Sequence, residues 1–184
     1  MFSNEIMHLL RAARLVILPK PDGGVRPIAI GNFWMKLAGS TAMTLSSIKS
    51  ESFQHAIGMP DGAKKIVHVT REHARLGHAI VRFDMKNGFG TMPRGFIAQQ
   101  LTKMRDIDCL STYFRTMYRT DVPLVAFTRG QKPSHLSAAD GILQGDAASA
   151  YLFTIGYDSL VREVVNLCSQ HCLLYTSPSP RDED

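Results

Sequence analysis

The chain has 184 residues, of which 45% are hydrophobic and 20% charged, so it can form one globular domain and lacks the composition of a disordered protein. No apolar run approaches the ~20 residues of a membrane span, and the start lacks the pattern of a signal peptide. The three cysteines form no CxxC pair, which favours a reducing compartment and an intracellular, not a secreted, protein. The net charge of +5 favours an anionic partner, although the basic residues are scattered.

The first part of the chain predicts a helix, a hairpin and a second helix. Residues 4–13 favour a helix, and residues 15–18 form an apolar strand run. The turn residues 21–24 separate that run from a second strand at residues 25–30. Residues 33–50 are again helical in pattern.

The middle of the chain predicts three helices around one buried strand. Residues 55–63 contain two Gly and one Pro, which indicates a loop, and residues 64–75 then return to a helical pattern. The apolar residues 79–83 predict a buried strand. Two further helices are expected at residues 93–104 and 108–118.

The last part of the chain predicts a strand at residues 122–127, a loop at 130–140 and a long helix at 147–170. Because helices and strands interleave irregularly, the predicted class is α+β or mixed α/β. Residues 172–184 lose all periodicity and resemble a translated sequencing adapter, which predicts a disordered tail that is not part of the domain. A native disordered C-terminus is the alternative.

One aspartate follows the predicted buried strand. A carboxylate at the point where a rigid strand meets solvent suits a hard divalent ion, because Mg²⁺ prefers oxygen ligands and takes one or two protein carboxylates. Asp84 therefore predicts a metal site. The alternative is an aspartate that caps the turn from a strand into a loop.

A Gln-Gly-Asp run precedes the long C-terminal helix. Gly145 would let the backbone approach a ligand closely, and Gln144 can form hydrogen bonds to it. Asp146 would cap the helix that is expected to begin at Ala147. A capped helix alone would explain Asp146, but not the Gln-Gly before it.

Two cations flank the predicted hairpin turn. With a three-residue loop at 22–24, Lys20 and Arg26 would lie directly opposite each other on one face. Such a pair can clamp a triphosphate, because Arg offers bidentate contacts and Lys a point charge. A hairpin with solvated charges is the alternative.

Three segments in this order resemble the core motifs of reverse transcriptases. They are LPKPDGGVRPI at residues 18–28, FDMKNGF at 83–89 and GILQGD at 141–146, and the resemblance spans residues 14–168. Residues 55–63, Lys86-Asn87 and Arg94 resemble the non-LTR retrotransposon type. Gly88 and Ala147 depart from that pattern, which has Ala and Pro there.

The resemblance implies the fingers (residues 1–78) and a partial palm (residues 79–171) of a right-hand polymerase without a thumb. Its activity would be RNA-directed DNA polymerisation with Mg²⁺ (or Mn²⁺), an RNA template, a DNA primer and dNTPs. The implied roles are metal binding by Asp84 and the Met85 backbone carbonyl, triphosphate binding by Lys20 and Arg26, a sugar gate at Phe89, and a nucleotide pocket at Gln144 and Gly145.

The aromatic-Ala-Asp-Asp motif that should follow GILQGD is absent from the sequence and is expected beyond the adapter junction. We therefore expect the isolated chain to be inactive. A nuclear location is expected if the source is a eukaryotic retrotransposon. The alternatives are a group II intron maturase, a telomerase-like enzyme, an RNA-templated RNA polymerase or a non-catalytic nucleic-acid-binding remnant of a decayed element.

Overall fold

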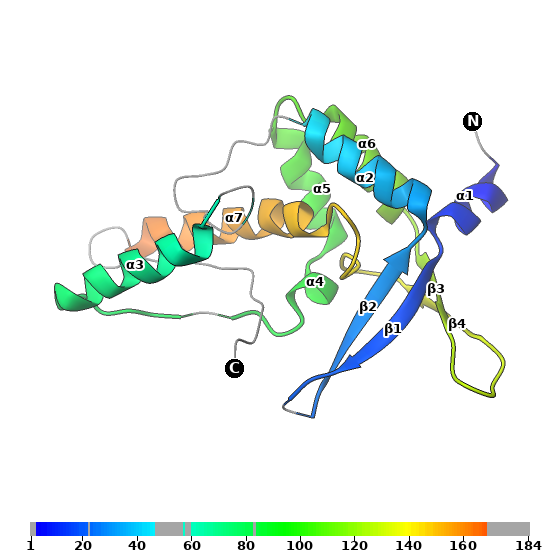
Figure 1. Ribbon diagram of the computed structural model, residues 1–184. Helices are drawn as coiled ribbons and strands as arrows, with labels where there is room; N and C mark the ends of the chain where they lie inside the picture. The colour runs from blue at the N-terminus through cyan, green and yellow to red at the C-terminus, as the bar shows by residue number, and fades with distance from the viewer. Residues whose placement is uncertain (1–2, 22, 47–56, 58–59, 83, 169–184) are drawn as a thin grey trace. The chain divides into compact units, whose positions relative to one another are not determined.

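The computed structural model describes residues 3–21, 23–46, 57, 60–82 and 84–168. Over these residues the chain has seven helices and a four-stranded sheet, so the predicted α+β class is confirmed (Figure 1). The elements in order are α1 (Asn4–Arg11), β1 (Ala13–Pro19), β2 (Val25–Gly31), α2 (Phe33–Leu45), α3 (Gly62–Arg75), α4 (Gly88–Thr91), α5 (Arg94–Lys103), α6 (Asp108–Tyr118), β3 (Val122–Ala126), β4 (Ser134–Ala138) and α7 (Ser149–Cys168). No helix in this part of the chain is long and apolar enough to span a membrane.

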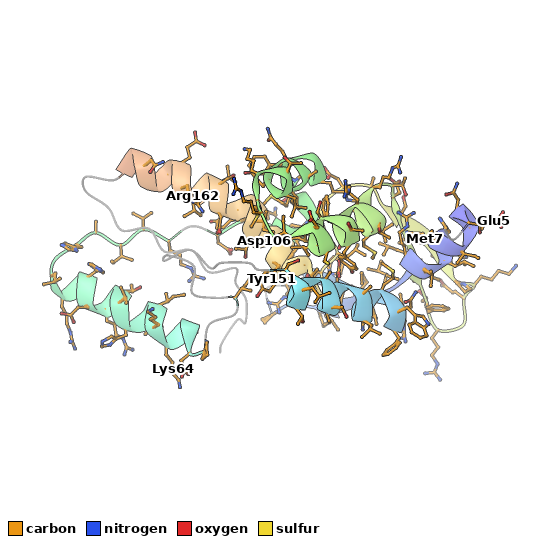
Figure 2. The ribbon with its side chains drawn as sticks, turned by 90° about the horizontal axis from the view of Figure 1, so that it is seen from above. Glu5, Met7, Lys64, Asp106, Tyr151 and Arg162 are labelled. Carbon is orange, nitrogen blue, oxygen red and sulfur yellow. The ribbon has the colours of Figure 1, made fainter. Side chains whose placement is uncertain are left out.

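The chain divides into two compact units. The first unit comprises Met1–Ile48 and Asn87–Phe153, and it contains the sheet and most of the helices. The second unit comprises Lys49–Lys86 and Thr154–Asp184, and it contains α3 and the greater part of α7. Figure 2 labels Tyr151 and Arg162, which mark the parts of α7 in the first and second unit. The predicted division into fingers and palm stays a prediction.

The sheet of the first unit has the strand order β2-β1-β3-β4. The pairs β1–β2 and β3–β4 are antiparallel, whereas β1 and β3 run parallel. Strand β2 is therefore an edge strand, with one side of its backbone available to another segment. This edge becomes important at the candidate site.

The core of the first unit forms around α6, whose predicted bounds of 108–118 are confirmed. Its buried residues recur at helical spacing and form one apolar stripe, which comprises Leu110, Tyr113, Phe114, Met117 and Tyr118. The helix packs against α2 and α5, which contribute the buried Met35 and Ile97 (Figure 1). The sequence periodicity was sufficient here because the apolar stripe has helices to pack against.

The strand predicted at residues 79–83 is wrong for residues 79–82, and Phe83 lies outside the described residues. Residues 79–82 have irregular backbone and exposed side chains, with Ile80 and Val81 each 43% exposed. A strand requires a neighbour that completes its hydrogen bonds. Residues 79–82 are not part of the four-stranded sheet in the described part of the chain, so apolar content alone produced a false strand prediction.

The loop predicted at residues 130–140 is also wrong, because β4 lies within it. Strand β4 pairs antiparallel with β3, with Leu136 opposite Leu124. Its side chains are mostly exposed, as suits an edge strand, and it therefore lacks the apolar alternation that predicts strands. Pairing with β3 determines this strand, and a local sequence pattern does not reveal it.

Smaller differences concern the ends of elements. Helix α2 ends at Leu45, and residues 47–50 of the predicted helix lie outside the described residues. Most of the predicted loop at 55–63 and the whole tail at 172–184 also lie outside them, as do residues 169–170 of the last predicted helix. Pro93 precedes α5 as its N-cap, and α7 begins at Ser149, after a turn at residues 147–148.

Candidate functional site

The hairpin of β1 and β2 carries the two predicted phosphate-binding cations in a different register. Arg26 lies opposite Leu18, and the Lys20 amide donates to the Gly24 carbonyl oxygen at 2.9 Å. The predicted pairing of Lys20 directly with Arg26 is therefore wrong, because Lys20 bonds to Gly24 and Arg26 pairs with Leu18. Side-chain alternation in this register still places Lys20 and Arg26 on one face, as diagonal neighbours about 7–8 Å apart.

The edge of β2 is joined to the Gln-Gly segment. The Ala29 amide donates to the Gln144 carbonyl oxygen at 2.8 Å. Gly145 has a φ of +111°, and a Cβ atom there would lie 2.6 Å from the Ala29 carbonyl oxygen. Close approach to a ligand was the predicted reason for Gly145; the structure shows close approach to a strand of the same chain.

The second contact joins the segment around Phe89 to the segment before Gln144. The Ile142 amide donates to the Phe89 carbonyl oxygen at 2.8 Å. A Cβ atom on Gly141 would lie 2.3 Å from the Gly90 carbonyl oxygen, so these two backbones touch. The Phe89 ring lies 5.1 Å, centroid to centroid, from the Phe153 ring of α7. Two motifs that are far apart in the sequence therefore meet in the first unit.

Arg94, in the first turn of α5, binds the chain segment that leads to Gln144. Its guanidinium donates to four backbone carbonyl oxygens, those of Gly141 (2.7 Å), Ala138 (2.8 Å), Thr120 (3.3 Å) and Tyr118 (3.5 Å). It also lies over the Tyr118 ring, 5.2 Å from the centroid. Burial lowers the pKa of Arg94, and the Tyr118 and Asp140 side chains act in the opposite direction.

The Asp140 carboxylate binds backbone amides of the same region, those of Arg94 and Gly141. Its Oδ1 accepts hydrogen bonds from the Arg94 amide at 3.2 Å and from the Gly141 amide at 2.8 Å. These bonds, first that from Gly141 and then that from Arg94, lower the pKa of Asp140. The Arg94 side chain and the Asp140 side chain thus both join the segment around Gly141 to the start of α5.

Asp146 binds two tyrosines of α6. Tyr113 donates its hydroxyl to Oδ1 at 2.7 Å, and Tyr118 donates to Oδ2. The Tyr118 hydroxyl also accepts the Leu143 amide at 3.2 Å. Burial, followed by the Asp146 charge, raises the pKa of both tyrosines. The predicted capping of the helix stays a prediction: the Ala148 amide donates to Oδ1 at 3.1 Å, but Ala148 lies in the turn before α7, which begins at Ser149.

Asp84 and Met85 belong to the second unit. Asp84 is exposed and Met85 half-buried, and both lie in irregular backbone. Burial raises the pKa of Tyr157 on α7, and the charge of Asp84 adds to that rise. Over the described residues, no group of three or more His, Cys, Asp or Glu side chains could hold a metal ion.

Sequence reasoning missed four residues of this region, namely Arg94, Tyr113, Tyr118 and Tyr157, as contributors to a site. Arg94 enters the sequence prediction only through the family resemblance, and none of the three tyrosines enters it as a site residue. The hydrogen bonds of Arg94, Tyr113 and Tyr118 join residues 24 to 47 positions apart, as with Arg94–Tyr118 and Arg94–Gly141. Tyr157 and the charge that acts on it, that of Asp84, are still further apart in the sequence. A local pattern carries no signal for such contacts; an unusual pair of buried tyrosines on one apolar helix face is the nearest sequence sign.

Comparison with known proteins identifies the family. The family model described as reverse transcriptase (RNA-dependent DNA polymerase) matches residues 18–176, which is most of the chain. No curated protein matches the chain. The matched range includes all three motif segments and every predicted site residue. The chain therefore belongs to the reverse transcriptase (RNA-dependent DNA polymerase) family.

Proposed function

We propose that this chain supplies the nucleotide-binding and metal-binding parts of an RNA-directed DNA polymerase of the non-LTR retrotransposon type. The family implies RNA-directed DNA polymerisation in general, with template, primer and dNTPs. One observation supports the finer proposal. The Phe89 segment contacts the segment that ends in Gln144 and Gly145, and Gln144 in turn binds the strand that carries Arg26.

In this proposal, each part of the first unit binds a different part of the incoming nucleotide. Lys20 and Arg26 share a face of the hairpin and hold the triphosphate, because Arg offers bidentate contacts to phosphate and Lys a point charge. Phe89 packs under the sugar, where an aromatic ring excludes a 2′-hydroxyl. Gln144 and Gly145 line the pocket beside the strand.

Asp84 is the proposed metal ligand and catalytic carboxylate of the second unit. Its exposed carboxylate and the Met85 backbone carbonyl are hard oxygen donors, which fit Mg²⁺ or Mn²⁺ when substrate phosphates complete the coordination shell. When bound, such an ion supplies Lewis-acid stabilisation of phosphoryl transfer. A pair of ions needs more carboxylates than Asp84 alone supplies, so the 184-residue chain by itself is not expected to catalyse primer extension.

Because the chain is not expected to incorporate nucleotides, equilibrium nucleotide binding tests the proposed pocket directly. The dissociation constants of a dNTP and the matching rNTP would be measured on a template–primer with Mg²⁺. We expect the chain to prefer the dNTP, and the substitution Phe89→Ala to reduce that preference about tenfold, since one pocket contact contributes on the order of 1–3 kcal/mol. Phe127→Ala, which removes a 62% exposed aromatic, serves as the matched control.

Two results would count against this proposal. An equal affinity of the unaltered chain for dNTP and rNTP would remove the basis for a sugar gate. A preference that survives Phe89→Ala would assign the selection to another residue. An equal loss of the dNTP preference in the Phe89→Ala and Phe127→Ala variants would show a general loss of structure and not a specific role of Phe89.

A further inference from the structure

We propose that Arg94 is a positioning residue that sets the sugar selectivity of the nucleotide pocket without touching the nucleotide. The inference rests on the proposed function, specifically on Phe89 as the residue beneath the sugar. Arg94 would act by fixing the backbone of residues 138–142, which in turn fixes Phe89 and the approach to Gln144.

The Arg94 side chain is already bound by backbone groups of its own chain. The guanidinium has five N–H groups, and its three nitrogens already donate to four backbone carbonyl oxygens. The two shortest of these bonds, to Gly141 and Ala138, are 2.7 and 2.8 Å long. A side chain committed in this way is a poor ligand for a triphosphate, so an effect of Arg94 on binding must pass through the backbone that it holds.

The backbone segment that Arg94 binds, residues 138–142, contacts the Phe89 segment directly. The Ile142 amide donates a hydrogen bond to the Phe89 carbonyl oxygen. Ile142 is the residue directly after Gly141, which accepts the shortest hydrogen bond from Arg94. Gly141 also lies against Gly90 so closely that no side chain would fit between them. Backbone contacts of this kind leave no flexible side chain to absorb a displacement, so a shift of Gly141 moves the Phe89 segment.

These four hydrogen bonds require an arginine at position 94. Only a guanidinium presents donors in a rigid planar fork that can reach carbonyl groups of two separate segments, residues 118–120 and 138–141. Lysine keeps the charge but has a single ammonium at the end of a flexible stem, so it would satisfy fewer of these carbonyls. Arg94→Lys therefore removes the positioning and preserves the charge.

The experiment compares Arg94→Lys with Arg115→Lys, an exposed arginine of α6 that serves as the matched control. The readouts are the ratio of rNTP to dNTP dissociation constants on a template–primer with Mg²⁺, the hydrogen-exchange rate of the Ile142 amide, and the melting temperature. The ratio is informative because an unfolded fraction weakens both affinities equally and cancels. We expect Arg94→Lys to lower the ratio about tenfold or more and to accelerate Ile142 exchange, since a displacement near 1 Å can cost that much.

A second variant keeps the proposal testable if Arg94→Lys does not fold. Asp140→Ala removes an exposed carboxylate that binds the same backbone, and it should lower the ratio in the same direction by a smaller factor. A ratio unchanged within twofold in the folded variant would overturn the positioning role. A chain without any dNTP preference before substitution would instead overturn the sugar gate itself, and this inference with it.

Discussion

At the scale of single residues, the Asp146 carboxylate shows how this family's Gln-Gly-Asp segment is held in place. Each of its oxygens accepts a tyrosine hydroxyl from α6, and Tyr118 additionally binds the Leu143 amide. Tyr118 is 3% exposed and its bond to the Leu143 amide is buried, so an unpaired partner there is costly. The turn before α7 is therefore attached to the core by side chains that serve no direct role at the proposed pocket.

Tyr118→Phe should lower the free energy of unfolding by about 1.5–3 kcal/mol, because it leaves Asp146 Oδ2 and the Leu143 amide without this hydroxyl. Tyr113→Phe should cost less, since Asp146 Oδ1 keeps the Ala148 amide as a donor. Denaturation curves at neutral pH would measure both. Equal costs in the two variants would contradict the argument.

The same variants should differ in alkaline solution. The folded chain raises the pKa of both tyrosines above the unfolded value of about 10, so their contribution is present below pH 10 and is lost as the pH rises further. Removing either hydroxyl should flatten the decline in stability above pH 10. A decline of unchanged slope in the double variant would assign it to other groups.

At the scale of elements, the edge of β2 is closed by a loop and not by another strand. The Gln144 carbonyl accepts the Ala29 amide, and Gly145 lies beside the Ala29 carbonyl. An edge strand covered in this way is protected from pairing with other chains, and it also links the hairpin to α7. The hairpin and the Gln-Gly segment are consequently held together by backbone contacts.

Gly145→Ala should be destabilising by about 1–3 kcal/mol, because alanine would adopt a left-handed backbone and its Cβ would meet the Ala29 carbonyl oxygen. Gly95→Ala provides the control, since this glycine lies within α5 and a Cβ there meets nothing within 4 Å. That substitution should stabilise the chain by about 0.5–1 kcal/mol. Urea midpoints of the two variants should move in opposite directions, and a shared direction would contradict this account.

At the scale of the whole molecule, the prediction concerns what the chain can do alone. Primer extension with Mg²⁺ or Mn²⁺ should give no template-dependent incorporation, because Asp84 is a single carboxylate where a two-ion site needs more. Binding to a template–primer should persist at low salt and weaken steeply as salt rises, as phosphate contacts require. The binding curve thus controls for folding, and incorporation above background would refute the prediction.

Local patterns in the sequence were sufficient to predict an element where its apolar periodicity or turn residues lie within the element itself. The α+β class, the hairpin, and the bounds of α6 followed from apolar periodicity and turn residues, because such a stripe becomes buried in almost any compact fold. The family resemblance also came from the sequence, since motif residues keep their order along the chain.

The tertiary structure decided everything that depends on a partner distant in the sequence. It placed a strand at 134–138 and none at 79–82, because backbone hydrogen bonds need a neighbouring strand that the local sequence does not specify. It shifted the hairpin register that separates Lys20 from Arg26. It also assigned Arg94 to backbone carbonyls and Asp146 to two tyrosines, since hydrogen-bond partners are chosen by proximity after folding and leave no periodic trace in the chain.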